Sequence, residues 1–188
     1  VRDIETESYL KQARGDFYAL AHSRRSVRNL LPDPVERQTI NEVVALALTA
    51  PSVCNRQTGR VHIYQNPQLI ARMLEIQEGA RGFIENIGNL AIISSNVSFF
   101  RGGNERNQSY VDGGILLMNF LYAIHYQGLG GVALNWAAGR EKDMKLRRLI
   151  DFPDSEVIVS LVGFGRLKER FAVPESSRLT LEEAMTYH

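Results

Sequence analysis

The stretch SYVDGGILLMNFLYAIHYQGLGG, residues 109–131, is the most hydrophobic part of the chain. A helix formed by this stretch has no wholly polar face, and such a helix is buried nearly all round in a folded domain. Asp112, Asn119 and His125 interrupt the apolar run, which argues against a membrane span. Gly128 is expected to end the helix, because glycine is preferred just past a helix C-terminus. The sequence therefore predicts a central helix around which the other elements pack.

The segments on either side show helical and strand-like patterns. Apolar residues at helical spacing predict helices over residues 6–21, 35–49, 67–78 and 141–150. Alternating or β-branched runs predict strands over residues 60–66, 89–95, 131–136 and 156–165. Residues 176–185 are expected to form a tail or a short helix. This order favours an α+β fold with a mixed central sheet, packed with helices around the buried central helix.

The organisation of the chain is simple. No linker rich in Gly, Ser and Pro divides it, so we expect residues 1–188 to form a single domain. No signal peptide opens the chain, but it begins at Val1 rather than Met, which leaves room for a missing N-terminal segment. The single cysteine, Cys54, excludes an intramolecular disulfide and fits a reducing compartment, so the cytoplasm is the expected location.

The charges are balanced overall, with 22 Lys and Arg residues against 21 Asp and Glu. No global field therefore favours nucleic acid or a membrane surface, and any anion site must be local. One local cluster lies in HSRRSVRNL, residues 22–30, where Ser26 stands among Arg24, Arg25 and Arg28. The arginines repel one another, so solvent or a bound anion must offset the repulsion.

Two interpretations of this cluster remain open, a solvated surface patch and a phosphate site. Guanidinium groups together with hydroxyls are suited to binding phosphate. The segment PESSR near the C-terminus offers the same chemistry, at Ser176, Ser177 and Arg178. The sequence alone does not show whether the two segments meet in space.

Other kinds of site find little support. The four histidines are scattered and form no metal-ligand pair with Cys54 or with each other, so we expect no metal site. No Gly-x-Ser-x-Gly motif is present, and Cys54 has no evident partner for covalent catalysis. The glycines of GLGG, residues 128–131, follow a predicted helix and precede a strand, the reverse of the order in a dinucleotide-binding loop.

These features together resemble the nitroreductase family of FMN-dependent oxidoreductases. Four segments carry the resemblance in the family's order: SRRSVRNL, ALTAPSVCNRQ, DGGILLMNFLYAIHYQGLGG, and VSLVGFG followed by SSRLTLEE. Each segment is weak alone, and their order and spacing make the resemblance specific over most of the chain. It implies a nitroreductase-like fold and a homodimer that binds FMN at the subunit interface.

The resemblance also implies which residues bind FMN. Arg24 and Ser26 face the phosphate and ribityl end with Arg25 nearby, and Arg28 reaches the pyrimidine edge of the ring. The partner subunit contributes a loop that contains Pro51, Ser52, Val53 and Asn55. Gln57 supports this loop. Arg178 closes on the phosphate with Ser176 or Ser177. Asn135 and Trp136 lie where the family presents a backbone N–H to flavin N5.

The implied activity is transfer of two electrons from NADH or NADPH to a nitroaromatic, a quinone or a similar small acceptor. The flavin carries this chemistry, so no catalytic side chain is expected. Thr58 and Gly59 stand where the family often has Pro-Trp, and a serine stands where many members have a second basic residue in the tail. Two alternatives therefore stay open: a flavoprotein of the dehalogenase or dehydrogenase type, and a non-catalytic flavin-fold module.

Overall fold

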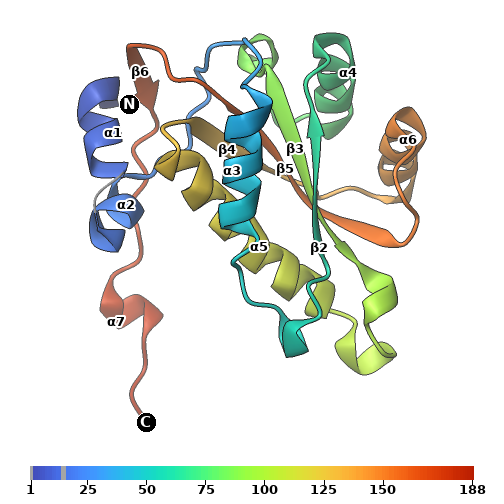
Figure 1. Ribbon diagram of the computed structural model, residues 1–188. Coiled ribbons are helices and arrows are strands. Elements are labelled where there is room, and N and C mark those ends of the chain that lie inside the picture. The colour runs from blue at the N-terminus through green and yellow to red at the C-terminus, as the bar shows by residue number, and fades with distance from the viewer. Residues whose placement is uncertain (1, 14–15) are drawn as a thin grey trace.

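The computed structural model describes residues 2–13 and 16–188 (Figure 1). Its strands are β1 (Arg2–Glu5), β2 (Gly59–Tyr64), β3 (Asn89–Asn96), β4 (Gly130–Asn135), β5 (Glu156–Gly165) and β6 (Arg170–Val173). Its α-helices are α1 (Thr6–Ala13), α2 (Phe17–Ser23), α3 (Arg37–Ala47), α4 (Pro67–Gln77), α5 (Gln108–Tyr126), α6 (Arg140–Ile150) and α7 (Leu181–Ala184). Short 3-10 helices are η1 (Val53–Asn55), η2 (Ile84–Asn86), η3 (Val97–Phe99) and η4 (Gly103–Glu105).

The central sheet has the strand order β2-β3-β5-β4. The three pairings between these strands are antiparallel. In the described residues, parallel pairing is confined to an isolated bridge between Ser26 and Gly131. The α+β architecture is thus confirmed, but the prediction of a mixed central sheet is wrong, because its strands pair antiparallel and the parallel bridge lies outside these pairings.

Helices cover both faces of the sheet (Figure 1). Successive residues of a strand point to opposite faces, and β3 shows this directly. Leu90 and Ile92 belong to a core cluster with residues of α4 and α6, whereas Ala91 and Ile93 belong to a cluster with residues of α3 and α5. The strand is buried on both faces, which is why its sequence reads as a nearly continuous apolar run.

Helix α5 is the central helix that the sequence predicts. Its inner side approaches β5 so closely that a Cβ added at Gly113 would overlap Val159 Cγ2. The helix ends at Tyr126, and Gly128 follows with a φ of +79°, the left-handed conformation of a C-terminal stop. The predicted helix and its predicted end are confirmed.

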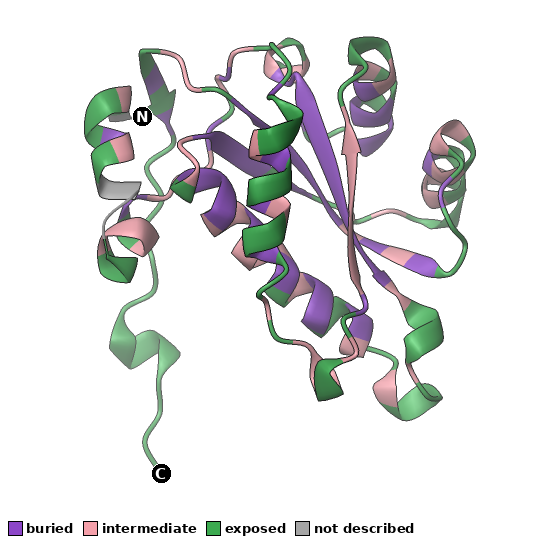
Figure 2. Cartoon of the chain, in the orientation of Figure 1, coloured by how far each residue is buried: buried purple, intermediate pink, exposed green. Residues whose placement is uncertain are grey.

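The outer side of α5 departs from the expectation of burial all round (Figure 2). Val111, Ile115 and Tyr126 are 52%, 39% and 44% exposed, and Met118 and Tyr122 are half-buried. These five residues recur every three or four positions, so they form one stripe along the helix. We call them the outer stripe. Part of the stripe is covered within the chain, because the Tyr122 ring packs edge-on against Phe17 of α2 with 5.7 Å between centroids. Val111, Ile115 and Tyr126 remain exposed.

The N-terminal region differs from the sequence prediction in two ways. The helix expected over residues 6–21 forms two helices, α1 and α2, and residues 14–15 lie outside the described part of the chain. Asp16 begins α2 by accepting a hydrogen bond from the Ala19 N–H at 2.9 Å. Strands β1 and β6, which the sequence analysis missed, pair with each other in a small antiparallel sheet. This sheet joins the start of the chain to the segment that precedes the C-terminal tail.

Candidate functional site

The arginine cluster (Arg24, Arg25 and Arg28) follows α2 and runs beside the edge strand β4. The bridge between Ser26 and Gly131 fixes this position, and the Val27 N–H donates to the Gly131 carbonyl at 3.0 Å. Within the described residues, none of the three guanidinium groups forms a salt bridge. The cluster therefore presents uncompensated positive charge next to an open sheet edge.

Three buried side chains hold the backbone of the arginine cluster in place. The Tyr9 hydroxyl accepts a hydrogen bond from the Arg25 backbone N–H at 3.0 Å, and its ring lies 4.3 Å from that of His125 between centroids. Ser23 Oγ and His125 Nε2 are 2.7 Å apart. We call Tyr9, Ser23 and His125 the support group. It holds the backbone that carries Arg24 and Arg25 against α5.

Burial and charge shift the pKa values of this region. Burial lowers the pKa of His125 to about 4, and the positive charges of Arg24 and Arg25 act in the same direction. Burial raises the pKa of Tyr9 and lowers that of Arg24. At neutral pH the support group is therefore uncharged, and the positive charge stays on the arginines.

The C-terminal tail brings Arg178 toward the cluster. The positive charge of Arg178 is one of the causes that lower the pKa of Arg24, so the two guanidinium groups lie within electrostatic range. Arg178 Nη1 donates to the carbonyls of Ser176 and Ser177 at 3.4 and 3.2 Å, and all three residues are exposed. The charge of Arg178 therefore acts on Arg24, while its guanidinium contacts the carbonyls of its own tail.

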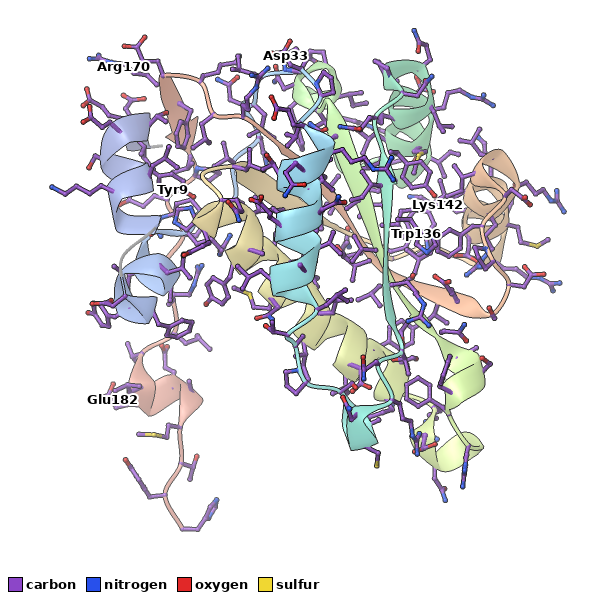
Figure 3. All side chains as sticks on the ribbon, in the orientation of Figure 1. Tyr9, Asp33, Trp136, Lys142, Arg170 and Glu182 are labelled. Atoms are coloured by element: carbon purple, nitrogen blue, oxygen red, sulfur yellow. The ribbon has the colours of Figure 1, made fainter. Side chains whose placement is uncertain are left out.

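Asn135 and Trp136 lie at the end of β4 (Figure 3). The Asn135 carbonyl accepts a hydrogen bond from Gln77 Nε2 at 2.9 Å. Trp136 Nε1 donates to Asp143 Oδ1 at 2.9 Å, and its ring packs against the core cluster of α4 and α6. Trp136 is thus largely a packed side chain, whereas Asn135 belongs to the exposed edge.

The direction of the Asn135 backbone N–H follows from the strand geometry. The Gly131 carbonyl points away from β5 because it accepts from Val27. In an antiparallel strand the N–H and C=O of one residue point to the same side, and residues two positions apart point alike. The N–H of Asn135, four positions after Gly131, therefore points away from β5, on the side of β4 where Val27 contacts Gly131.

Arg28 lies near the residue that precedes η2. Its guanidinium carbon lies 5.9 Å from the centroid of the Phe83 ring, just before η2. Asp33, the acid that a surface interpretation would pair with Arg28, instead forms a salt bridge with Arg166 at 3.3 Å. Arg28 is exposed and keeps its charge available.

The loop of residues 51–57 adopts an unusual backbone conformation. Cys54, Asn55 and Gln57 have φ values of +49°, +52° and +51°. Non-glycine residues rarely adopt such values, and a concentration of them is typical of functional sites. The Val53 N–H donates to both carboxylate oxygens of Asp112, at 3.3 and 3.2 Å, which ties the loop to the first turns of α5.

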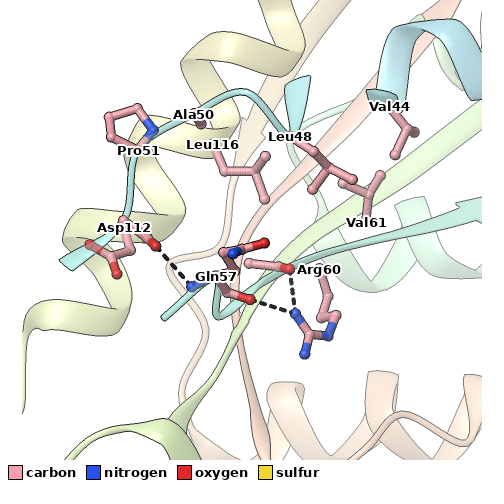
Figure 4. A pocket seen from close by; sticks show the side chains of 11 residues that line it. Val44, Leu48, Ala50, Pro51, Gln57, Arg60, Val61, Asp112 and Leu116 are labelled. Atoms are coloured by element: carbon pink, nitrogen blue, oxygen red, sulfur yellow. Dashed lines mark hydrogen bonds between the residues drawn. The ribbon is translucent and has the colours of Figure 1, made fainter. Parts of the chain in front are cut away.

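A hollow of about 350 Å³ lies beside this loop (Figure 4). Its apolar lining includes Val44 and Leu48 of the α3 segment, Val61 of β2 and Leu116 of α5. Its polar lining comes from the loop and its surroundings: Ser52, Gln57, Arg60 and Asp112. The size and mixed lining suit part of a small organic molecule.

The loop and the arginine cluster sit at opposite ends of α5. Asp112 holds the loop at one end, and His125 holds Ser23 at the other. Thirteen residues separate them, which at 1.5 Å per residue is about 20 Å. The structure thus brings Arg24, Arg25 and Ser26 together beside the start of β4, with Arg178 within electrostatic range of Arg24. It places Pro51, Ser52, Val53, Asn55 and Gln57 in a second group at the other end of α5.

The described residues contain no group of three or more His, Cys, Asp or Glu side chains placed to hold a metal ion. None of the helices in the described part of the chain is long and apolar enough to cross a membrane.

Several residues at the site escaped the sequence analysis. Tyr9 accepts a hydrogen bond from Arg25, 16 positions away, and Ser23 contacts His125, 102 positions away. No local sequence pattern predicts contacts over such separations. Gln77 and Asp112 occur in helices whose apolar residues dominate the pattern. One indication was present in the sequence, because Asp112 and His125 are polar residues within a long apolar stretch.

Comparison with known proteins places the fold. Residues 21–81, which include the arginine cluster and the loop, match the nitroreductase family. The structure is similar to that of an FMN-dependent nitroreductase of Clostridium difficile, with a TM-score of 0.74 and 16% identity, covering 90% of this chain and 98% of that one. It is also similar to NfrA2 of B. megaterium, with a TM-score of 0.77 and 18% identity, covering 91% and 74%.

Two characterised relatives show sequence similarity. An iodotyrosine deiodinase of Nematostella vectensis is 22% identical over 209 aligned residues, which cover 97% of this chain and 79% of the deiodinase. A 4-nitrobenzoate reductase of Pseudomonas putida is 44% identical over 48 residues, which cover 26% of this chain and 21% of the reductase. The expected nitroreductase-like fold is confirmed.

Proposed function

We propose that the chain, which has a nitroreductase-like fold and matches the nitroreductase family over residues 21–81, is an FMN-dependent oxidoreductase. The observation that carries the proposal is the arginine cluster, which forms no salt bridge among the described residues and lies beside the edge strand β4, whose last residue is Asn135. A phosphate would offset the cluster's repulsion, and the Asn135 N–H would face the flavin ring. Bound FMN supplies the two-electron chemistry, with NADH or NADPH as donor and a nitroaromatic, a quinone or a similar acceptor.

The chain's own residues would then have separate tasks. We assign phosphate binding to Arg24, Arg25, Ser26 and Arg178, with Ser176 or Ser177 next to Arg178. Arg28 would face the pyrimidine edge of the ring, and the Asn135 N–H would hold the ring near N5. Trp136 would wall the pocket from its packed position. The support group would keep the arginines in place, with its own side chains uncharged.

A homodimer is part of the proposal. The loop residues Pro51, Ser52, Val53 and Asn55, with Gln57, lie about 20 Å along α5 from the arginine cluster, so a second chain is suited to supply them. The apolar outer stripe of α5 offers the surface on which two chains would pack. The tail beyond residue 174 carries exposed apolar side chains, among them Leu179 and Leu181, both 72% exposed. Each chain would contribute one part of each of two flavin sites.

We further propose that residues 1–188 act as one domain, since the core clusters share one sheet. The cytoplasm fits this reaction, because the exposed thiol of Cys54 stays reduced there.

The test is a visible absorption spectrum of the purified protein, followed by anaerobic addition of NADH or NADPH. Flavin bands that bleach with either donor support the proposal. A protein that neither copurifies with FMN nor binds it on reconstitution would refute it.

Reductive dehalogenation is the second candidate, because the deiodinase is similar along 97% of this chain. The two candidates differ in their donors and acceptors. Fast flavin reduction by NAD(P)H with turnover of quinones or nitroaromatics would favour the first. Halide release from an iodinated phenol, with chemically reduced protein and slow NAD(P)H oxidation, would favour the second.

A further inference from the structure

A second group of arginines lies near the loop, at the other end of α5 from the arginine cluster: Arg56, Arg60, Arg101 and Arg106. Contacts through η3 and η4 bring the group together. Arg56 Nη1 donates to the Phe99 carbonyl at 3.3 Å and pairs with Glu105 Oε1 at 2.8 Å. The Arg60 guanidinium lies 5.9 Å from the centroid of the Phe99 ring. We call these four residues the second arginine group.

The acids near this group leave it with a net positive charge. Glu105 is engaged by Arg56 and by the Arg101 backbone N–H, and Asp112 accepts from Val53 and Gln108. Both carboxylates therefore already accept hydrogen bonds from groups other than the Arg60 guanidinium. Arg60 forms no salt bridge within the described residues.

Arg60 also borders the hollow (Figure 4). Its Nη1 donates to the backbone carbonyls of Gln57 and Gly59, at 2.9 and 2.8 Å, which fixes the guanidinium beside the loop. The other guanidinium N–H groups remain as donors, since arginine has five. Across the hollow lie apolar side chains, including Leu48 and Leu116. A flat apolar ring would fit against the apolar lining of the hollow, and an anionic substituent on that ring would pair with the Arg60 guanidinium.

We propose that the hollow and Arg60 select a small aromatic carboxylate as the electron acceptor. The inference rests on the proposed function, because only the proposed dimer brings this loop to a flavin, that of the partner subunit. The ring of the acceptor lies against the apolar lining, and its carboxylate pairs with Arg60. Arg60 is a specificity-determining residue: it recognises the charge of the acceptor and takes no part in electron transfer.

Two anionic groups in such a reaction are able to pair with Arg60: the carboxylate of an acceptor and the pyrophosphate of NADH or NADPH. The observations favour the acceptor, because the hollow of about 350 Å³ suits a single ring rather than a dinucleotide. Measuring the affinity for each separately distinguishes the two.

The test compares benzoate with benzamide, a neutral molecule of nearly the same shape, as ligands of the flavin-loaded protein in isothermal titration calorimetry. Wild-type protein is expected to bind benzoate more tightly than benzamide. In Arg60→Gln the benzoate affinity should fall about tenfold to a hundredfold, the usual effect of losing a charged hydrogen-bond partner. Arg148→Gln, which removes an exposed arginine on α6, is the matched control and should leave the benzoate affinity unchanged.

Steady-state kinetics provide the second readout. In Arg60→Gln the KM for 4-nitrobenzoate divided by that for nitrobenzene is expected to rise about tenfold, with little change in kcat for either acceptor. An unchanged ratio and an unchanged benzoate affinity would overturn the inference. A raised KM for NADH with an unchanged ratio would also overturn it and would assign Arg60 to the dinucleotide.

The inference and the proposed function can fail separately. A protein that binds no FMN refutes the proposed function, and with it the acceptor role of Arg60. A protein that binds FMN and oxidises NADH, but shows no preference for benzoate over benzamide, keeps the proposed function and refutes this inference alone. If Arg60→Gln fails to fold, Arg60→Lys serves in its place, because it keeps the charge and loses the planar fork. The affinity of Arg60→Lys for benzoate should lie between the wild-type affinity for benzoate and the wild-type affinity for benzamide.

Discussion

Ser23 Oγ and His125 Nε2 lie 2.7 Å apart, although 102 positions separate the two residues in the sequence. Ser23 is the last residue of α2 and directly precedes Arg24, and His125 lies in the last turn of α5. Nδ1 of His125 is buried and has no hydrogen-bond partner among the described residues. A proton on this ring would place a charge in the interior beside Arg24 and Arg25. Burial and the neighbouring positive charges therefore favour the neutral form of His125.

This arrangement predicts a loss of stability in acid. The pKa of His125 is about 4 in the folded protein and about 6.5 in an unfolded chain. Between these values the unfolded chain binds a proton that the folded protein does not, so the free energy of unfolding falls as the pH drops from 6.5 toward 4. Above pH 6.5 the effect is absent, and at pH 4 the loss reaches up to about 3 kcal/mol.

Thermal unfolding of wild type and His125→Gln at several pH values checks this prediction. Glutamine keeps a polar group near Ser23 but does not titrate, so the difference in Tm between the two proteins should shrink as the pH falls from 6.5 to 4. His188→Gln, at the exposed end of the chain, is the control and should follow the wild type at every pH. Parallel curves for wild type and His125→Gln would mean that His125 is not the titrating group.

Removal of the tail arginine is expected to weaken FMN more than riboflavin. Arg178 lies within electrostatic range of Arg24, and a phosphate between them would accept charged hydrogen bonds from both. Losing one such bond costs roughly 1.5–3 kcal/mol, or about tenfold to a hundredfold in affinity. Fluorescence titration of Arg178→Ala with both ligands measures this. Riboflavin lacks the phosphate, so equal losses for the two ligands would show that Arg178 does not contact it.

The main elements of the fold could be predicted from local patterns. Helix α5 was recognisable by its dense apolar run and its end at Gly128, and β5 by ten residues of strand-like sequence. Strands β1 and β6 have four residues each and no long alternation, so nothing local distinguishes them from loops. The burial of α5 was overestimated because the sequence shows that a helix is apolar, but not which side its own chain covers.

The candidate site was predictable in its residue types and not in its contacts. The positive charges of Arg24 and Arg178 could be recognised, but their approach depends on the course of a tail more than 150 residues away. The sequence indicates His125 only as a polar residue within an apolar run. The structure gives it one partner, Ser23, and leaves its other ring nitrogen without one. Long-range contacts of this kind arise from tertiary packing, which leaves no trace in local spacing.

A charge placed on the outer stripe is expected to separate the proposed dimer. Ile115 is 39% exposed in the middle of the stripe, and Ile115→Glu would bury an unpaired carboxylate between two α5 helices. An unpaired buried charge at an interface typically raises the dissociation constant about a hundredfold or more. Sedimentation velocity at micromolar concentration measures the change, and the affinity for FMN should fall with it, because each site would lose the partner's loop.

Met144→Glu is the matched control for this change. Met144 is 37% exposed, close to the value for Ile115, but it lies on α6, away from the stripe. It should leave both the sedimentation coefficient and the FMN affinity unchanged. A wild-type protein that is monomeric and still binds FMN would contradict the dimer itself.

Arg28 is expected to raise the redox potential of a bound flavin. Two-electron reduction places negative charge on the pyrimidine edge of the ring, and a guanidinium there stabilises the reduced form more than the oxidised form. Arginine suits this role because it stays protonated at any working pH. In the structure Arg28 is free to act on a ligand, since Asp33 pairs with Arg166 and the Arg28 guanidinium rests near the Phe83 ring.

The exposure of Arg28 limits the size of this effect. Two unit charges 4 Å apart interact by about 4 kcal/mol at an effective dielectric constant of 20, and solvent reduces that to roughly 1–2 kcal/mol. For a two-electron couple this corresponds to about 20–40 mV. Arg28→Ala should therefore lower the potential by that amount, and Arg28→Lys by less, because the charge remains while the planar fork is lost. Spectroelectrochemical titration of the three proteins measures the shift. Arg166→Ala supplies the control, since it removes an arginine that already has an acidic partner, and equal potentials for Arg28→Ala and Arg166→Ala would place Arg28 outside the flavin site.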